Sequence, residues 1–99
     1  MKMVFMTYKD SQDHEVMKIL EDLDIPAFTR WKDVQAKSRS GRPRMGTDVW
    51  PGLNYAITFA IEEETAKELL LRVREFNEGT KFEGIKAMCW RLDDVCWKE

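Results

Sequence analysis

The stretch Leu53-Asn54-Tyr55-Ala56-Ile57-Thr58-Phe59-Ala60-Ile61 carries the clearest structural signal in the chain. Large apolar side chains occupy its odd positions, and small or polar side chains occupy its even positions. Successive side chains of a β-strand point to opposite faces of a sheet, so this alternation predicts a strand with one large apolar face. The small residues of the second face are expected to let a helix pack closely there.

Two strands and a helix are predicted before this stretch. Residues 2–8 form an apolar, β-prone run, which predicts a strand. Apolar side chains then repeat at helical spacing through 12–23, and Pro26 prevents this helix from continuing. Residues 28–34 predict a second strand, on which Arg30 shares one face with Phe28 and Lys32.

A helix and a strand are predicted after it. Three carboxylates at 62–64 suit the positive end of a helix dipole, and an apolar stripe follows over 66–76. Asn77 or Gly79 is expected to end this helix as a left-handed cap. Residues 85–91 then predict the last strand, and 92–97 predict a final turn or short helix.

The order of these elements predicts an α+β fold, a ferredoxin-like βαββαβ sandwich. Its four-stranded antiparallel sheet has both helices on one face and a long loop between the second and third strands. Residues 1–99 are expected to form one domain. One small domain offers no cover for the other sheet face, so a homo-oligomer is expected. The side chains expected to fill that second layer are Trp31, Met88, Trp90 and Leu92.

Charge is unevenly distributed along the chain. Segment 30–46 carries six Lys or Arg residues against Asp33, a net charge of +5, which leaves −7 for the remainder of a chain of net charge −2. A local positive field on an acidic body favours a localised anionic partner. The chain has no apolar run long enough for a membrane span, and a cytoplasmic location is expected.

The basic loop-like segment of about 36–52 is the predicted working surface. Its arginines often neighbour Ser or Gly, which favours recognition of phosphate or carboxylate through the guanidinium fork. A small anionic ligand would suit a cleft that forms where loops meet across a subunit boundary. The candidate ligand-binding residues are Lys32, Lys37, Ser38, Arg39, Gly41 and Lys86, and the candidate partner-binding residues are Arg42, Arg44 and Trp50. The alternative is a solvated insertion, which is compatible with ordering on binding.

Catalytic signals are weak in this sequence. His14 is the lone histidine, so no Ser/His/Asp or Cys/His arrangement can be assembled, and we predict no enzyme activity and no catalytic residue. Cys89 and Cys96 lack the spacing of a zinc or redox motif. A soft-metal site built from Met1, Met3, Met6, His14 and the two cysteines is conceivable, but core packing explains these spacings better.

The sequence resembles the PII-like signalling proteins, and two stretches carry the resemblance beside the element order. Leu23-Asp24-Ile25-Pro26-Ala27-Phe28-Thr29-Arg30-Trp31 is similar to the helix exit into the second strand of that family. Gly84-Ile85-Lys86-Ala87-Met88-Cys89-Trp90-Arg91-Leu92-Asp93-Asp94-Val95 is similar to its final strand. The loop end at 46–54 resembles a divergent subgroup.

The resemblance implies a homotrimer with an adenine nucleotide (ATP, ADP or AMP) or another small anion in clefts between subunits. It places Thr29 near the adenine and Lys86 at the phosphates, and it implies a protein target, a transporter or an enzyme, for the long loop. The chain departs from the family where Glu83 and Ile85 replace glycines, and it lacks two arginines beyond the last strand.

Two other functions are compatible with the same fold. A CutA-like protein that responds to divalent metals is one alternative. A ferredoxin-fold nucleic-acid-binding module is the other, and the acidic body and the missing aromatic RNP pattern disfavour it. An enzyme, such as a small dimeric α+β barrel monooxygenase, is a further alternative that rests only on the shared fold.

Overall fold

The computed structural model describes residues 1–37, 53–81 and 84–98. Strand β1 spans Lys2–Lys9, a single 3-10 turn spans Asp10–Gln12, and helix α1 spans Asp13–Asp22. Strands β2 (Thr29–Val34) and β3 (Asn54–Ile61) follow, then helix α2 (Glu63–Gly79) and strand β4 (Lys86–Arg91). The βαββαβ order predicted from the sequence is confirmed.

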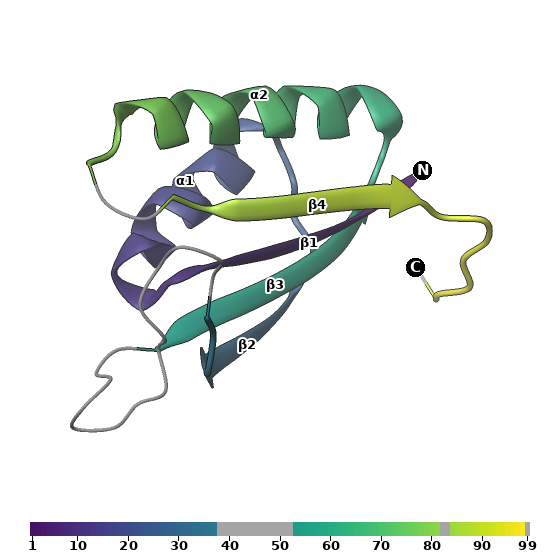
Figure 1. The fold of residues 1–99 in the computed structure, drawn as a ribbon. Helices are drawn as coiled ribbons and strands as arrows, with labels where there is room; N and C mark the ends of the chain where they lie inside the picture. Colours follow the sequence, from purple (N-terminus) through teal and green to yellow (C-terminus); the bar gives the residue numbers. More distant parts are fainter. Residues whose placement is uncertain (38–52, 82–83, 99) are drawn as a thin grey trace.

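The strands form one four-stranded antiparallel sheet in the order β2-β3-β1-β4. Both helices lie on the same side of this sheet (Figure 1). Strand β1 is central, since it pairs with β3 over its whole length and with β4 from Lys2 to Thr7. The end of β2 and the starts of β3 and β4 therefore lie at one end of the sheet, and the N-terminus and the C-terminal segment lie at the other (Figure 1).

The helices cover the large apolar face of β3. Ile57 and Phe59 belong to one buried cluster with Leu20 of α1 and Leu69 of α2. The expectation that a helix packs against the small residues of β3 is wrong. Burying the large side chains removes more apolar area from water, and this decides which face the helices take.

The opposite face of the sheet carries large apolar side chains that neither α1 nor α2 covers. Trp31 on β2 and Trp90 on β4 are about half exposed, at 47% and 49%, and Met88 is exposed to 46%. The register places the small side chains of β3, including Ala56 and Ala60, between them. We refer to this surface as the open face.

Two predictions are wrong, one about the end of α2 and one about the residues that follow β4. Gly79 ends α2 without a left-handed cap, and the next residue, Thr80, is extended with φ −95°. The side-chain amide of Asn77 instead donates to the carbonyl of Ile85 at 2.9 Å and accepts from its N–H at 2.8 Å. Residues 92–97, expected as a turn or short helix, have no regular secondary structure.

No helix in the described part of the chain is both long and apolar enough to cross a membrane.

Candidate functional site: a cleft beneath the C-terminal segment

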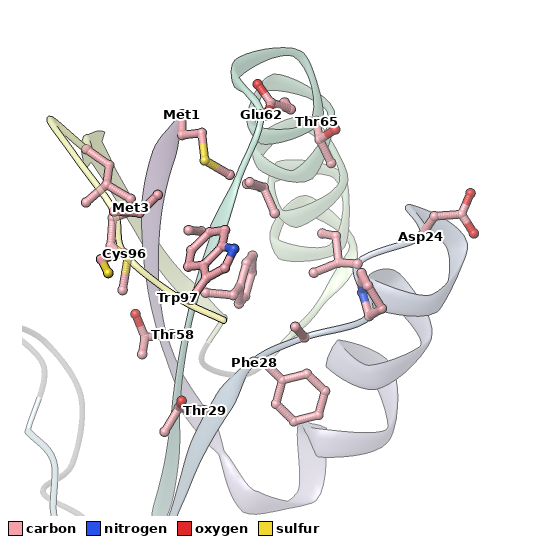
Figure 2. Close-up of a pocket in the computed structure, with 18 of the residues that line it drawn as sticks. Met1, Met3, Asp24, Phe28, Thr29, Thr58, Glu62, Thr65, Cys96 and Trp97 are labelled. Carbon is pink, nitrogen blue, oxygen red and sulfur yellow. The ribbon is translucent and has the colours of Figure 1, made fainter. Parts of the chain in front are cut away.

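A cleft of about 880 Å³ opens at the end of the sheet where the chain begins and ends. It lies between the C-terminal segment, the start of β1, the end of β3 and the residues that lead into β2 (Figure 2). Its volume falls within the range of small-molecule pockets in proteins.

Backbone pairing brings the two chain ends to this cleft. Strand β1 starts beside the end of β3, where Met3 pairs with Ala60. The N–H of Leu92 donates to the carbonyl of Met1 at 3.1 Å, which continues the pairing of β4 with β1 beyond Arg91. The chain then turns back, so that Cys96 and Trp97 lie over the cleft (Figure 2).

The lining is mainly apolar, with aromatic and sulphur-bearing side chains. Trp97 and Phe28 both line it and are exposed to 53% and 41%, so part of each aromatic surface is accessible to a ligand. Such surfaces stack well on flat rings. The lining carboxylates include Glu62, next to the start of α2, whereas Lys98 is its only lining Lys or Arg among the described residues.

Among the predicted ligand-binding residues that the structure describes, Thr29 alone lines this cleft. It pairs with Thr58 across β2 and β3, and both side chains are drawn along one side of the cleft (Figure 2). The hydroxyl of Thr58 donates to the carbonyl of Val4 at 2.8 Å, so this hydroxyl is already engaged in the sheet. Thr29 is exposed and can offer its hydroxyl to a ligand.

Lys32 and Lys86 lie at the opposite end of the sheet and do not meet within one chain. Lys86 opens β4, in the same row of paired residues as Trp31, with β3 and β1 between them. At the usual strand spacing the two edge strands are about 14 Å apart. The ammonium of Lys32 lies 5.8 Å from the ring centre of Tyr55, on the helix-covered side. The sequence analysis expects Lys32 and Lys86 to meet across a subunit boundary, so their roles in ligand binding stay predictions.

Lys37 is exposed and is the last described residue before the central part of the basic segment. The remaining candidates lie outside the described residues: Ser38, Arg39, Gly41, Arg42, Arg44 and Trp50.

A second group of polar side chains joins the helix layer to β2. The carboxylate of Asp13 accepts hydrogen bonds from the Tyr8 hydroxyl at 2.7 Å and from the Arg30 guanidinium at 3.0 Å. Arg30 also lies 5.8 Å from the ring centres of Phe28 and Tyr55. Burial, and then the hydrogen bond to Asp13, raise the pKa of Tyr8 above its usual value. The shared face of Phe28, Arg30 and Lys32 agrees with the sequence prediction.

The chain resembles solved PII-like structures over most of its length. CPII, a nitrogen regulatory PII-like protein from Thiomonas intermedia K12 bound to ADP, AMP and bicarbonate, matches with a TM-score of 0.69 and 15% identity over 92% of each chain. This chain has the PII-like fold. A PII-like signalling protein from Thermus thermophilus matches with a TM-score of 0.64 and 19% identity, over 90% of this chain and 83% of that one.

No family model matches this sequence, and no curated protein matches it. A second structure of CPII, bound to ADP and bicarbonate, matches with a TM-score of 0.70 and 16% identity, over 94% of this chain and 88% of that one. The PII-like fold predicted from the element order is therefore confirmed at low sequence identity.

Sequence reasoning missed most of the residues that line the cleft in this PII-like fold. The alternation along β1 does place Met1 and Met3 on one face, which was a usable signal. The return of Cys96 and Trp97 over that face had no signal, because residues 92–98 lack periodicity. The role of Asp13 was also missed, since a carboxylate at a helix start is explained by the helix dipole alone.

Proposed function

We propose that this chain is a non-catalytic PII-like regulator that assembles as a homotrimer and binds an adenine nucleotide between subunits. The observation that carries the proposal is the PII-like fold, shared with CPII, whose solved structures contain ADP, AMP and bicarbonate. The open face supports assembly, because exposed apolar patches of this kind mark interfaces.

The cleft supports a ligand with a flat ring. Thr29 offers a hydroxyl at its edge, and Phe28 and Trp97 offer aromatic surface. The cleft alone is poorly suited to phosphates, since Glu62 and Asp24 line it and Lys98 is its lone lining Lys or Arg in the described ranges. We infer that the phosphates take their cations from a neighbouring copy, through Lys86 and the basic segment.

The basic segment supports control of a partner protein. This segment, about 36–52, overlaps residues 30–46, which carry a net charge of +5 on an otherwise acidic chain. A positive surface of this kind attracts acidic partners and helps to select them. We propose that the ligand changes how this segment contacts a target, a transporter or an enzyme, in the cytoplasm.

The test is the solution mass of the purified protein, followed by thermal melts with ADP, AMP and ATP, each with and without bicarbonate. A ligand that binds only the folded state stabilises it by about 2.7 kcal/mol at 100 times its dissociation constant. We expect a trimer whose melting temperature rises with at least one nucleotide. A monomer, or a trimer that no nucleotide stabilises, would contradict the nucleotide-sensing function.

Two variants locate the ligand. Thr29→Val and Lys86→Met should each reduce the nucleotide-dependent rise while leaving the melting temperature of the free protein nearly unchanged, because both side chains are exposed. Lys18→Met, on the exposed side of α1, is the matched control and should keep the full rise. Equal responses of Lys86→Met and Lys18→Met would place the phosphates elsewhere.

A further inference from the structure

We propose that a row of four side chains links the cleft to the basic segment, and that a ligand packed against Phe28 acts on that segment through the row. The row consists of Phe28, Arg30, Tyr55 and Lys32. Phe28 is its starting point, because it lines the cleft (Figure 2) and also contacts Arg30. The regulatory role rests on the proposed function, whereas the linkage itself is a property of the protein without ligand.

Successive contacts of equal length join the four side chains. The guanidinium carbon of Arg30 lies 5.8 Å from the ring centre of Phe28 and 5.8 Å from that of Tyr55. The ammonium of Lys32 lies 5.8 Å from the same Tyr55 ring. Each distance is within the range over which a cation is attracted to a ring face. The row therefore reaches from the cleft to Lys32, shortly before the basic segment begins.

The backbone of β2 does not make this connection by itself. Strand β2 pairs regularly with β3 over residues 29–31, and its register then shifts before Val34. Asp33 lies within the shift and has a φ of 60°. Irregularities of this kind disrupt the hydrogen-bond ladder locally. The contact of Lys32 with Tyr55 spans the interruption, since Tyr55 is held in β3 by regular pairing with β1.

Arg30 is the anchored member of the row. One guanidinium nitrogen donates to both carboxylate oxygens of Asp13, at 3.0 and 3.3 Å, and to the sulphur of Met17 at 3.4 Å. Helix α1 therefore sets the position of this guanidinium. Because the guanidinium does not follow the Phe28 ring freely, a ligand that moves the ring changes the energy of their contact.

Arg30 and Lys32 carry like charges and share the Tyr55 ring. While the guanidinium also lies against Phe28, its attraction to Tyr55 is divided between two rings. A ligand that takes up the face of Phe28 leaves Tyr55 as the remaining ring of the row for Arg30. Lys32 is exposed, so its ring contact is the one that repulsion from Arg30 displaces. The chain beyond the register shift is then released.

The experiment is limited digestion of the whole chain with trypsin, in which mass spectrometry follows cleavage after the exposed Lys37. When local opening and closing are fast, this rate reports the open fraction. Cleavage after Lys67, inside α2, requires the helix to open and corrects for global unfolding. We expect Phe28→Leu to raise the corrected rate by roughly threefold or more, as for coupled residues in contact. Phe28→Tyr keeps a ring face and should keep the wild-type rate.

A double-mutant cycle shows whether the effect passes through Arg30. In an Arg30→Met background, Phe28→Leu should cause no further rise. Arg72→Met is the matched background, since Arg72 pairs with Asp22 in the helix layer, and there the full rise should remain. An unchanged rate in Phe28→Leu, or an equal rise in the Arg30→Met background, would overturn the linkage.

The same digestion with AMP, ADP or ATP tests the regulatory role. A nucleotide that raises the melting temperature should also raise the cleavage rate after Lys37 in the wild type, and it should not do so in Arg30→Met. An equal response of both proteins would overturn the regulatory role of the row. Absence of nucleotide binding would contradict the proposed function instead, because the double-mutant cycle is measured without ligand.

Discussion

Arg30 on β2 and Asp13 in the first turn of α1 form a salt bridge of 3.0 Å that ties an edge strand to the helix layer. Each side chain is about one-quarter exposed, so the pair is partly shielded from water. Among the described strands β2 pairs only with β3, and its register shifts between Trp31 and Val34, where Asp33 has a φ of 60°. This pair therefore positions the strand that leads into the basic segment.

Breaking this contact should destabilise the fold. We expect Arg30→Met to lower the free energy of unfolding by about 1–2 kcal/mol, since a charge-assisted hydrogen bond is lost. Asp13→Ala should cost more, about 2–3 kcal/mol, because the buried Tyr8 hydroxyl also loses its acceptor. Urea unfolding measures both values.

The control is the more exposed pair between Asp22 and Arg72, 2.9 Å long with side chains 43% and 36% exposed. Asp22→Asn should change stability by less than about 1 kcal/mol, as for most surface ion pairs. If Asp13→Ala proved no more costly than Asp22→Asn, the Arg30–Asp13 contact would have no special structural role.

Alkaline pH should weaken the protein through Tyr8. Burial raises the pKa of Tyr8 in the folded state, so above the unfolded value of about 10 the unfolded chain releases this proton first. The unfolded state then binds fewer protons, and stability falls as pH rises. Below that pH the contribution of Tyr8 is fully present.

Unfolding free energies measured from neutral pH to about pH 11 test this effect. Tyr8→Phe should remove part of the alkaline fall at the cost of the hydrogen bond to Asp13. Tyr55→Phe leaves that hydrogen bond in place and should keep the fall. Identical pH profiles for wild type and Tyr8→Phe would contradict the assignment to Tyr8.

The helices and strands were predictable because the apolar residues of each repeat at the spacing of a helix or of a strand. The alternation at 53–61 and the apolar stripe of 66–76 depend only on neighbours in sequence, and both predicted elements formed. Which face of β3 the helices cover was predicted wrongly, because that choice depends on what the other strands bury. Register pairs such as Met3 with Ala60 are invisible to local patterns.

The candidate site was less predictable for the same physical reason. Thr29 was predicted as a ligand-binding residue from the family resemblance alone, and the structure places it at the cleft. The packing of Cys96 and Trp97 over β1 joins residues more than 90 positions apart in sequence, without any repeating pattern. Asn77 was expected to cap a helix, whereas its side chain binds the backbone of Ile85.

Gly84 should be intolerant of any side chain. A Cβ at this position would collide with the side-chain amide of Asn77, which holds both backbone groups of Ile85. We expect Gly84→Ala to lower the free energy of unfolding by about 1–3 kcal/mol, through loss of these hydrogen bonds or displacement of the backbone. It should also weaken any ligand that depends on Lys86, two residues further on.

Gly79→Ala is the matched control. It lies at the end of α2, where a Cβ would have no atom within 4 Å, so the substitution should be neutral or slightly stabilising. Thermal melts of the two variants give the comparison. Equal stability of both would show that the contact between Asn77 and Ile85 adjusts without cost.

The open face should carry the assembly of the protein. Trp90 on β4 is 49% exposed on the side of the sheet that α1 and α2 leave uncovered, and interfaces concentrate their energy in such aromatic side chains. Trp90→Asp should therefore reduce the solution mass to that of a monomer while preserving the circular dichroism of the folded chain.

Leu71→Asp is the control, since Leu71 is 54% exposed on α2, away from the open face. Light scattering should give the wild-type mass for Leu71→Asp. A Trp90→Asp variant that keeps the wild-type oligomeric mass would show that the open face is not the principal interface, and a wild-type monomer would remove the basis for a ligand site shared between subunits.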